Sequence, residues 1–362
     1  MTGRQRLSAI LRKKPIDRLS WVPLMDHHTL DRLPGSMKDM TMSDFCRHLG
    51  ADIFSLDGWA TGGAFSSPRF CWPLNVKESC SRDEQNPDLA TREWKTSKGK
   101  LTGMTRRGHP MKYAVDTIEA VRAYREMWEG ATFSGPDDTE ALATMDKLLG
   151  DDGVVTRFWG PSTIPRLLEE DMGMENFYLL YFDHPEEMDG LIRTMHEREL
   201  QAFELLANGP WESATLCENT SSFYISPEIY KKYNMPHQRD FVQAMHLAGK
   251  PAILHMCGHV RDLLPLIRET GCDGIHALTP PPTGNTPWEM ALDAIGEDLV
   301  IFACLDPTIW ISGKIEEIAP TLDRIMTPRI RKANFALAPF ADGIPVPLER
   351  FEAIKKWFEK QA

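Results

Sequence analysis

Short apolar runs recur along the chain and alternate with longer amphipathic segments. Eight runs have the length of buried strands, and they lie at residues 20–25, 52–57, 153–158, 213–217, 251–255, 272–276, 299–303 and 334–338. Amphipathic runs of helix length lie between most of them or after the last, at 161–170, 185–207, 226–248, 260–270, 287–295, 315–327 and 347–360. Alternating strands and helices favour a parallel sheet, and eight such strands predict an α/β fold closed as a (β/α)8 TIM barrel.

Residues 58–150 depart from this alternation because they are too long for one crossover between parallel strands. The pattern predicts hairpin strands near 75–80 and 90–106, with a turn at 97–100, followed by helices near 117–128 and 137–149. We therefore predict that residues 1–362 form a single TIM-barrel domain and that residues 58–150 are an inserted cap of hairpins and helices beside the barrel mouth.

Charge and cysteine content restrict the possible partners. A net charge of −11 repels polyanions, so we expect neither nucleic acid nor an anionic membrane surface to be a partner. No stretch approaches 18 unbroken apolar residues, so no membrane span is expected. The seven cysteines lack the spacing of a disulfide framework, which favours free thiols and a cytoplasmic location. Composition leaves open whether the chain forms a homo-oligomer.

Polar side chains follow several of the predicted strands. In a TIM barrel the working groups lie at the carboxyl ends of the strands, where neighbouring strands bring them together. The candidates for proton transfer there are Asp57, Glu218 and His276. Glu218 and Asn219 could equally serve as caps and loop anchors for the turn at 220–222.

Four further residues are candidates for substrate binding. Asn219 offers a polar anchor, and the aromatic rings of Trp159 and Tyr224 could stack on a flat ligand or pack in the core. His27 follows the first strand next to His28. The two histidines cannot both face the mouth if the backbone there is extended, because adjacent side chains of a strand point to opposite faces.

The His255-Met256-Cys257 step ends the fifth predicted strand. A neutral imidazole and a thiolate are natural zinc ligands, and a third ligand could come from His276, Cys304 or Asp342 after the following strands. The alternative is that His255 and Cys257 are ordinary packed residues, because a free cysteine behaves as a small hydrophobic side chain.

Several segments together resemble the uroporphyrinogen decarboxylase superfamily. They are residues 4–7 with 15–19, 225–230, the run Pro-Ala-Ile-Leu-His-Met-Cys-Gly at 251–258, 269–275, 305–307 and 343–345. The resemblance covers nearly the whole chain and implies a (β/α)8 barrel. One branch of the superfamily contains decarboxylases that use no cofactor. The other contains methyltransferases that move a methyl group between a corrinoid protein and a thiol or pterin acceptor.

The loop after the first strand separates these branches. The decarboxylases have an arginine-rich loop there for a substrate with many carboxylates, whereas this chain has Met-Asp-His-His-Thr-Leu-Asp at 25–31. We therefore expect the methyltransferase branch, with cobalamin carried by a partner corrinoid protein and a small-molecule methyl acceptor or donor.

The resemblance also implies a zinc site. His255 and Cys257 match the family's zinc pair, and Asp342 stands where the family usually has a cysteine, so Asp342 or Cys304 is the expected third ligand. Two alternatives remain. One is a decarboxylase or lyase that uses Asp57, Glu218 or His276, and the other is a non-catalytic protein that binds a corrinoid or tetrapyrrole.

Overall fold

Eight parallel strands form one sheet whose spatial order follows the chain from the second strand to the last, and the first strand pairs with the last. The computed structural model describes residues 1–341 and 343–361. The strands are β1 (Ser20–Trp21), β3 (Ile53–Leu56), β10 (Gly153–Trp159), β11 (Ala214–Cys217), β12 (Ala252–His255), β13 (Gly274–Leu278), β14 (Val300–Ala303) and β15 (Phe335–Leu337). Each coincides with a predicted strand, so the predicted α/β barrel of eight parallel strands is confirmed.

The two end strands of this sheet, β1 and β3, meet at Asp52. The backbone N–H of Asp52 donates to the carbonyl of Trp21 at 3.0 Å. Its carboxylate accepts from Ser20 Oγ at 2.7 Å, from Arg6 Nη1 at 2.5 Å and from Arg18 Nη2 at 3.0 Å. Asp52 is only 2% exposed. This buried carboxylate joins the first strand to the second and so closes the barrel.

The first helix, α1 (Gly3–Leu11), packs on the barrel core. Thr2 caps it through a capping box with Gln5, which fixes where the helix begins. Its apolar side chains Leu7, Ile10 and Leu11 are buried in the cluster that includes interior residues of the strands. Each such buried side chain contributes about 1.5–3 kcal/mol, so α1 is an integral part of the barrel.

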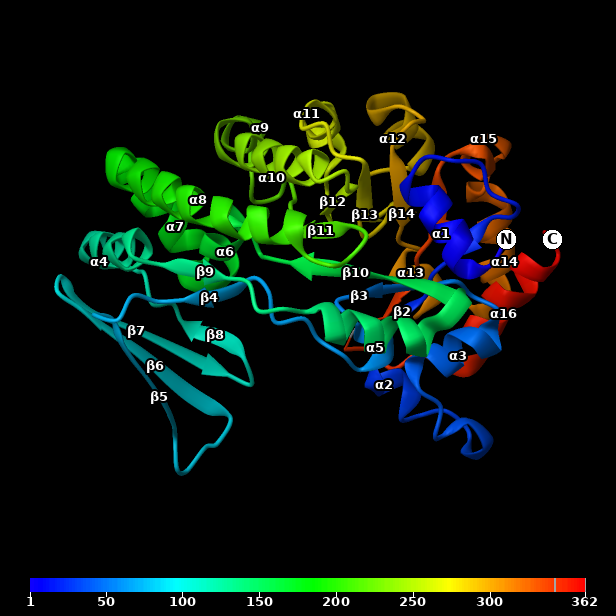
Figure 1. Ribbon diagram of the computed structural model, residues 1–362, viewed down its shortest axis with the longest axis horizontal. Helices are drawn as coiled ribbons and strands as arrows, with labels where there is room; N and C mark the ends of the chain where they lie inside the picture. The colour runs from blue at the N-terminus through cyan, green and yellow to red at the C-terminus, as the bar shows by residue number, and fades with distance from the viewer. Residues whose placement is uncertain (342, 362) are drawn as a thin grey trace. The chain divides into compact units, whose positions relative to one another are not determined.

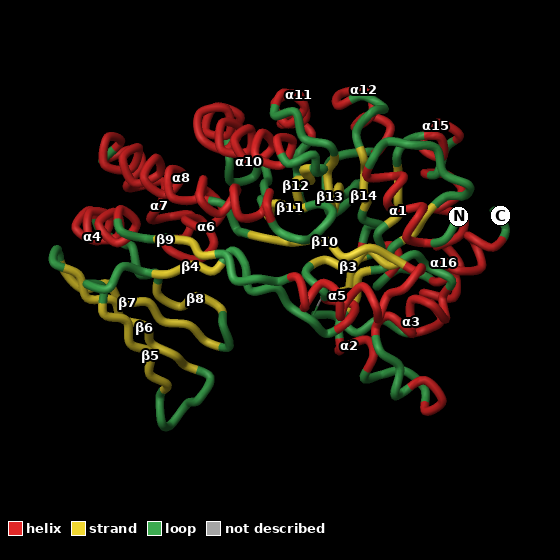
Figure 2. The backbone as a smooth tube through the Cα atoms, in the orientation of Figure 1, coloured by secondary structure: helices red, strands yellow, loops and turns green. Residues whose placement is uncertain are grey.

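Helices follow most strands and cover the sheet. α10, α11, α12 and α15 contact one another in succession beside β11 to β14 (Figures 1 and 2). The helices are α2 (His27–Leu30), α3 (Met42–Leu49), α5 (Thr139–Leu149), α9 (Pro227–Ile229), α10 (Met235–Leu247), α11 (Leu264–Glu269), α12 (Trp288–Ile295), α13 (Pro307–Trp310), α14 (Ile318–Ile325), α15 (Pro328–Lys332) and α16 (Leu348–Glu359). The short strands β2 (Leu24–Met25) and β16 (Phe340–Ala341) pair beyond the ends of β1 and β15.

The chain divides into two compact units. Unit 1 comprises 1–65, 137–159 and 209–362 and contains the barrel, and unit 2 comprises 66–136 and 160–208. The elements of unit 2 are β4 (Arg69–Cys71), β5 (Lys77–Arg82), β6 (Leu89–Thr96), β7 (Gly99–Arg106), β8 (His109–Lys112), α4 (Ile118–Glu129), β9 (Thr132–Ser134), α6 (Thr163–Arg166), α7 (Gly173–Asp183) and α8 (Pro185–Asn208). The hairpins and helices expected within 58–150 are present. That this segment caps the barrel mouth stays a prediction.

Unit 2 contains a buried polar cluster of its own. A π-helical segment at Leu167–Asp171 follows α6, and Tyr124 of α4 donates to Asp171 Oδ2 at 2.7 Å. Burial raises the pKa of Asp171 to about 7, although the positive charge of Arg166 opposes this shift. Thr163 donates to the carboxylate of Glu199 at 2.9 Å. Unit 2 therefore holds several ionisable groups that are buried, such as Glu199, or partly buried, such as Asp171.

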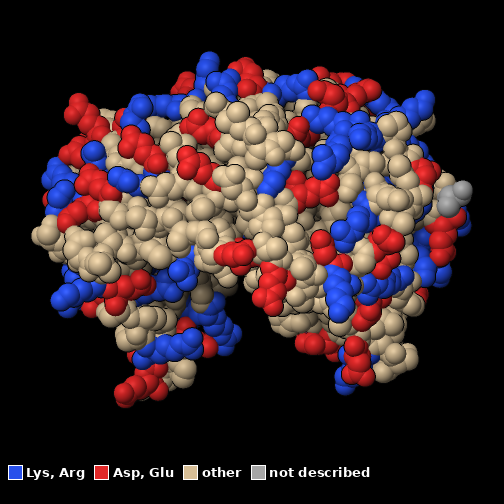
Figure 3. Space-filling view, in the orientation of Figure 1, with Lys and Arg blue, Asp and Glu red and all other residues tan. Residues whose placement is uncertain are grey.

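Acidic and basic side chains are interspersed over the face of the molecule drawn in Figure 3. Within the described part of the chain, no helix is both long enough and apolar enough to cross a membrane. All seven cysteines are free, as predicted from their spacing.

We expect Asp52→Ala to destabilise the protein by about 3–5 kcal/mol, because it leaves the buried guanidinium of Arg6 without its buried carboxylate. Urea unfolding followed by circular dichroism measures the change. The control is Asp293→Ala, which removes an exposed ion pair with Arg329 and should cost at most about 1 kcal/mol. Equal costs for the two variants would contradict the role assigned to Asp52.

Stability should also depend on pH through Asp171. Its pKa is about 7 in the folded protein and lies well below that in the unfolded chain, so the folded state binds the proton more tightly. Its stabilising contribution is therefore complete below about pH 4 and is lost as pH rises through about 7, by up to about 4 kcal/mol.

Asp171→Asn should remove this part of the pH dependence and make the protein more stable than the wild type above neutral pH. Unfolding midpoints measured between pH 4 and 8 test the prediction. Asp183→Asn, at an exposed position in the same unit, is the control and should leave the profile unchanged. A wild-type profile that rises between pH 4 and 7 and is unaltered by Asp171→Asn would refute it.

Candidate functional site

A cavity of about 720 Å³ opens at the carboxyl ends of the barrel strands. Its apolar lining residues are Leu24, Met25, Leu56, Trp59, Phe158, Ala277, Pro307 and Phe340. Its polar and sulfur-bearing lining residues are Asp57, Cys217, Asn219, His255, Cys257, His276, Thr279, Thr283 and Cys304. No lysine or arginine is among the described residues that line it. The cavity is thus an apolar chamber with thiols, imidazoles and one carboxylate.

Two histidines form a pair on neighbouring strands of the cavity wall. The register of β12 and β13 places His255 beside His276, and their Nδ1 atoms lie 2.7 Å apart. Burial lowers the pKa of His255 to about 4, and burial with the neighbouring His255 lowers that of His276 well below its usual value, so both rings are neutral at pH 7 and one donates to the other. Nε2 of His276 has no hydrogen-bond partner among the described residues, so no protein group fixes which ring carries the shared proton.

Three thiols lie along the same wall. Cys217 ends β11 and Cys257 follows β12, and their Sγ atoms lie 3.6 and 3.5 Å from Oδ1 of Asn219. Cys304 follows β14 and donates to the carbonyl of Leu305 at 3.4 Å. Burial, followed by the neighbouring Cys257, raises the pKa of Cys304 to about 12. The thiol therefore stays protonated unless a cation binds next to it.

Asp57, the carboxylate that lines the cavity, is bound by a buried arginine. Arg157 of β10 donates to the carboxylate of Asp57 and, at 2.5 Å, to the carbonyl of Phe158. The Arg157 side chain is only 8% exposed, and its guanidinium lies 6.0 Å from the ring centroid of Trp211. Burial raises the pKa of Asp57, while Arg157 opposes this shift. Arg157 was not predicted as a site residue, although a lone arginine in the apolar run 153–158 was a visible signal.

Backbone conformations that disfavour side chains also gather around the cavity. Asp57, Asn219 and Ala277 have φ values of 54°, 42° and 65°, in the left-handed region. For Ala277 the conformation accompanies a shift in the pairing of β13 with β14 directly after His276. Such conformations cost free energy and are typical of functional sites. They turn each strand end so that the adjoining polar side chains reach the cavity.

Six predicted site residues line this cavity, namely Asp57, Asn219, His255, Cys257, His276 and Cys304. Three others lie nearby without lining it. Glu218 is fully buried and accepts from Gln238 Nε2 at 2.6 Å, and Tyr224 donates to the backbone carbonyl of Asn219. Trp159 is 9% exposed at the end of β10. Asp342 lies outside the described residues. The roles assigned to all of these residues stay predictions.

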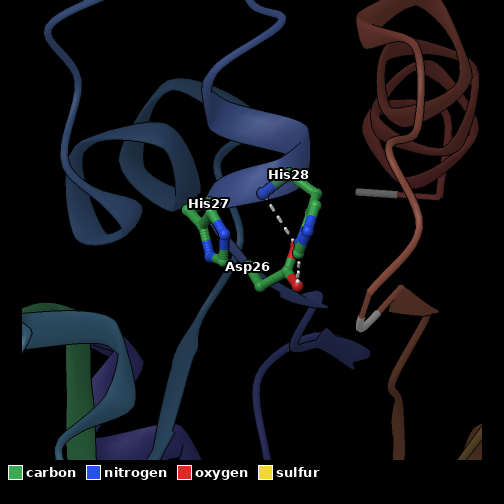
Figure 4. A group of neighbouring side chains, drawn as sticks. All are labelled: Asp26, His27 and His28. Carbon is green, nitrogen blue, oxygen red and sulfur yellow. Dashed lines mark hydrogen bonds and ion pairs between the residues drawn. The ribbon is translucent and has the colours of Figure 1, made fainter. Parts of the chain in front are cut away.

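The fourth residue outside the lining, His27, belongs to a cluster with Asp26 and His28 at the end of β2 (Figure 4). Asp26 caps α2 by accepting from the backbone N–H of His28 at 3.0 Å, so the chain turns helical here. The backbone at His27 and His28 is therefore not extended, so their side chains need not point to opposite faces. The two imidazole rings lie adjacent, with centroids 4.1 Å apart.

A second hydrogen bond holds Asp26 from another part of the chain. Its Oδ2 accepts from the backbone N–H of Gly343 at 2.8 Å and lies 2.8 Å from His28 Nδ1. Partial burial raises the pKa of Asp26, but the hydrogen bonds from His28 and Gly343 outweigh burial, and the net shift is downward. Asp26 is therefore an ionised carboxylate at neutral pH.

The donor set of the cavity fits zinc in kind, but the ligand atoms of His255, Cys257 and Cys304 do not all lie within 4.8 Å of one another. His255 is neutral, and Cys257 and Cys304 add thiols on the same wall, which are the nitrogen and sulfur ligands that zinc prefers. The hydrogen bond between Nδ1 of His255 and Nδ1 of His276 matches the arrangement in which a second group orients a ligating imidazole.

Comparison with known proteins places this geometry in a family. Residues 139–358, more than half of the chain, match the family described as uroporphyrinogen decarboxylase (URO-D). A segment of 124 residues is 27% identical to the methylcobamide:CoM methyltransferase MtbA of Methanosarcina acetivorans, and it spans 34% of each chain, about a third of that relative's length. The structure is similar to that of a methyltransferase from Methanosarcina mazei, with a TM-score of 0.59, 13% identity and 99% of each chain covered, which shows a common fold. The chain belongs to the uroporphyrinogen decarboxylase family.

Proposed function

We propose that the protein is a methyltransferase that moves a methyl group between a corrinoid protein and a small acceptor thiol, with zinc held at the barrel mouth. The observation that carries the proposal is the wall formed by His255, Cys257 and Cys304 in an apolar cavity. Soft sulfur and nitrogen donors in such a chamber suit the binding of a metal ion and a thiolate.

The relatives agree with this function. The segment shared with the methylcobamide:CoM methyltransferase is short, and the Methanosarcina mazei methyltransferase shares the fold at 13% identity. Both of these proteins are named as methyltransferases. These likenesses support the proposal, and the donor set of the cavity supplies the chemical reason for it.

The residues of the cavity would divide the work as follows. His255, Cys257 and Cys304 would hold zinc, with Asp342 as an alternative third protein ligand. Bound zinc would supply a positive charge that keeps an acceptor thiol ionised near neutral pH, and the thiolate is the species that attacks a methyl carbon bound to cobalt. His276 would accept the Nδ1 proton of His255 and so leave Nε2 of His255 for the metal.

The remaining walls would favour attack by the thiolate. Met25, Phe158 and Phe340 give the chamber an apolar lining, and a thiolate with little hydration is the stronger nucleophile. Asp57 follows β3 and is restrained by Arg157 of β10. It would position polar groups of the acceptor.

The cavity also bears on the decarboxylase alternative. A substrate with many carboxylates needs guanidinium or ammonium partners, and the described lining contains none. Arg157, the cation nearest to Asp57, is already paired with it. A decarboxylase acting on such a substrate is therefore disfavoured.

The first test removes two proposed zinc ligands together. His255→Ala with Cys257→Ser should abolish zinc binding in the cavity and slow methyl transfer from methylcobalamin to a thiol by at least about 100-fold, because a thiol that is not held as the thiolate is a poor nucleophile. Zinc content and the rate of methyl transfer are the measurements.

Cys80→Ser, at an exposed position in unit 2, is the matched control and should keep both properties. Zinc-free wild-type protein, or a double variant, whose transfer rate equals that of the zinc-loaded wild type would refute the zinc mechanism. Release of carbon dioxide from tetrapyrrole acids would instead favour the decarboxylase.

A second test concerns the third ligand. Cys304→Ala should lower the affinity for zinc by at least about tenfold if its sulfur binds the metal. Cys46→Ala is the matched control, because Cys46 is equally buried in α3 and burial raises the pKa of its thiol to about 12 as well. Equal zinc affinity in the two variants would exclude Cys304 and leave Asp342 as the third ligand.

A further inference from the structure

The cluster of Asp26, His27 and His28 is separate from the thiol wall of the cavity. Among the described residues, these are the only three histidine, cysteine, aspartate or glutamate side chains whose ligand atoms all lie within 4.8 Å of one another. None of the three lines the cavity. We infer that Asp26, His27 and His28 form a second metal site that takes a divalent first-row ion such as Zn²⁺, Co²⁺ or Ni²⁺.

The spacing of the ligand atoms suits a shared ion. Two ligand atoms that each lie about 2.0–2.2 Å from one metal ion are about 3 Å apart when they are at right angles around it. Oδ2 of Asp26 and Nδ1 of His28 are 2.8 Å apart, where a proton now lies between them. A metal ion can replace that proton with small movements, and the ring of His27 lies against that of His28.

The local fold holds the three ligands in place. The capping hydrogen bond to the N–H of His28 fixes one oxygen of Asp26, and the N–H of Gly343 fixes the other. Both histidines belong to the first turn of α2, and their ring centroids lie 4.1 Å apart. Pre-organisation of this kind lowers the free-energy cost of binding an ion.

The chemistry of the ligands selects the ion. Two imidazoles and one carboxylate are typical of Zn²⁺, Co²⁺, Ni²⁺ and Fe²⁺, whereas Mg²⁺ and Ca²⁺ prefer sites made of oxygen atoms. His27 and His28 are exposed, so solvent or an anionic ligand could fill the remaining coordination positions. The site is therefore an open one.

The chain contains a natural comparison. His246 Nε2 lies 2.8 Å from Asp273 Oδ2, and its side chain is 46% exposed, against 48% for His28. Among the residues that the structure describes, this second pair has no third ligand within reach, and Asp273 also binds Lys13 at 3.0 Å. If the third ligand decides binding, the Asp26 cluster binds metal and the Asp273 pair does not.

The test uses the full-length chain stripped of metal and titrated with Co²⁺. Equilibrium dialysis counts the bound ions. The absorption spectrum separates the two sites, because thiolate ligands give an intense charge-transfer band and imidazole and carboxylate ligands give only weak visible bands. Failure of the cavity to bind metal would thus remove the charge-transfer band without affecting the inference about Asp26.

His27→Ala and His28→Ala should each weaken the nitrogen and oxygen site by at least about tenfold, and His246→Ala should leave it unchanged. Co²⁺ should raise the thermal midpoint of the wild type and of His246→Ala by more than that of the double variant His27→Ala with His28→Ala, in which only the cavity could still bind the ion. Matching midpoints without metal show that the variants are folded. The inference is overturned if the two single variants at His27 and His28 bind as the wild type does, or if His246→Ala loses as much affinity as they do.

Discussion

Closure of the barrel at Asp52 is the constraint on which the geometry of the mouth rests. A parallel sheet of eight strands has two edges, and exposed edges leave backbone groups without partners. Asp52 links these two edges by bonding Trp21 of β1 through its backbone and by holding Arg6, Arg18 and Ser20 through its carboxylate. The two strands that it joins are followed in the chain by Asp26 and Asp57. The closure therefore also fixes the positions of these two carboxylates.

The register between neighbouring strands extends this constraint to the rest of the barrel. Because every strand is parallel to its neighbours, side chains far apart in sequence become adjacent at the strand ends. The pairing of His255 with His276 is a direct result, and the sulfur atoms of Cys217 and Cys257 meet at Asn219 for the same reason. The mouth is thus built from single residues that each strand contributes, rather than from one continuous motif.

The sequence predicted the strands and six of the cavity residues because both follow from simple periodicity. A buried parallel strand is a short apolar run, and the residue after it must reach the mouth. Three features were not predictable in this way. The ion pair of Arg157 with Asp57 depends on the register between two strands, and the left-handed turn at Ala277 breaks the regular alternation.

The third feature is Glu218, which directly follows a strand yet does not line the cavity. The backbone N–H groups of Glu218 and Asn219 both bond to the carbonyl of His255, and Asn219 has a positive φ, so the chain turns at this point. Asn219 lines the cavity, whereas Glu218 is fully buried beside Gln238 and Asn234.

Burial gives the two proposed metal sites opposite characters. Inside the cavity, low polarity holds His255 neutral and the thiol of Cys304 protonated, so metal binding there must displace protons from sulfur, and affinity should rise steeply with pH. In the Asp26 cluster, Asp26 is already ionised, and the two exposed imidazoles of His27 and His28 need little desolvation. The Asp26 cluster should therefore bind an ion at lower pH than the cavity does, and it should prefer harder ions. If both proposed sites bind metal, they would differ in preference, because the thiols select for soft ions and the Asp26 cluster does not.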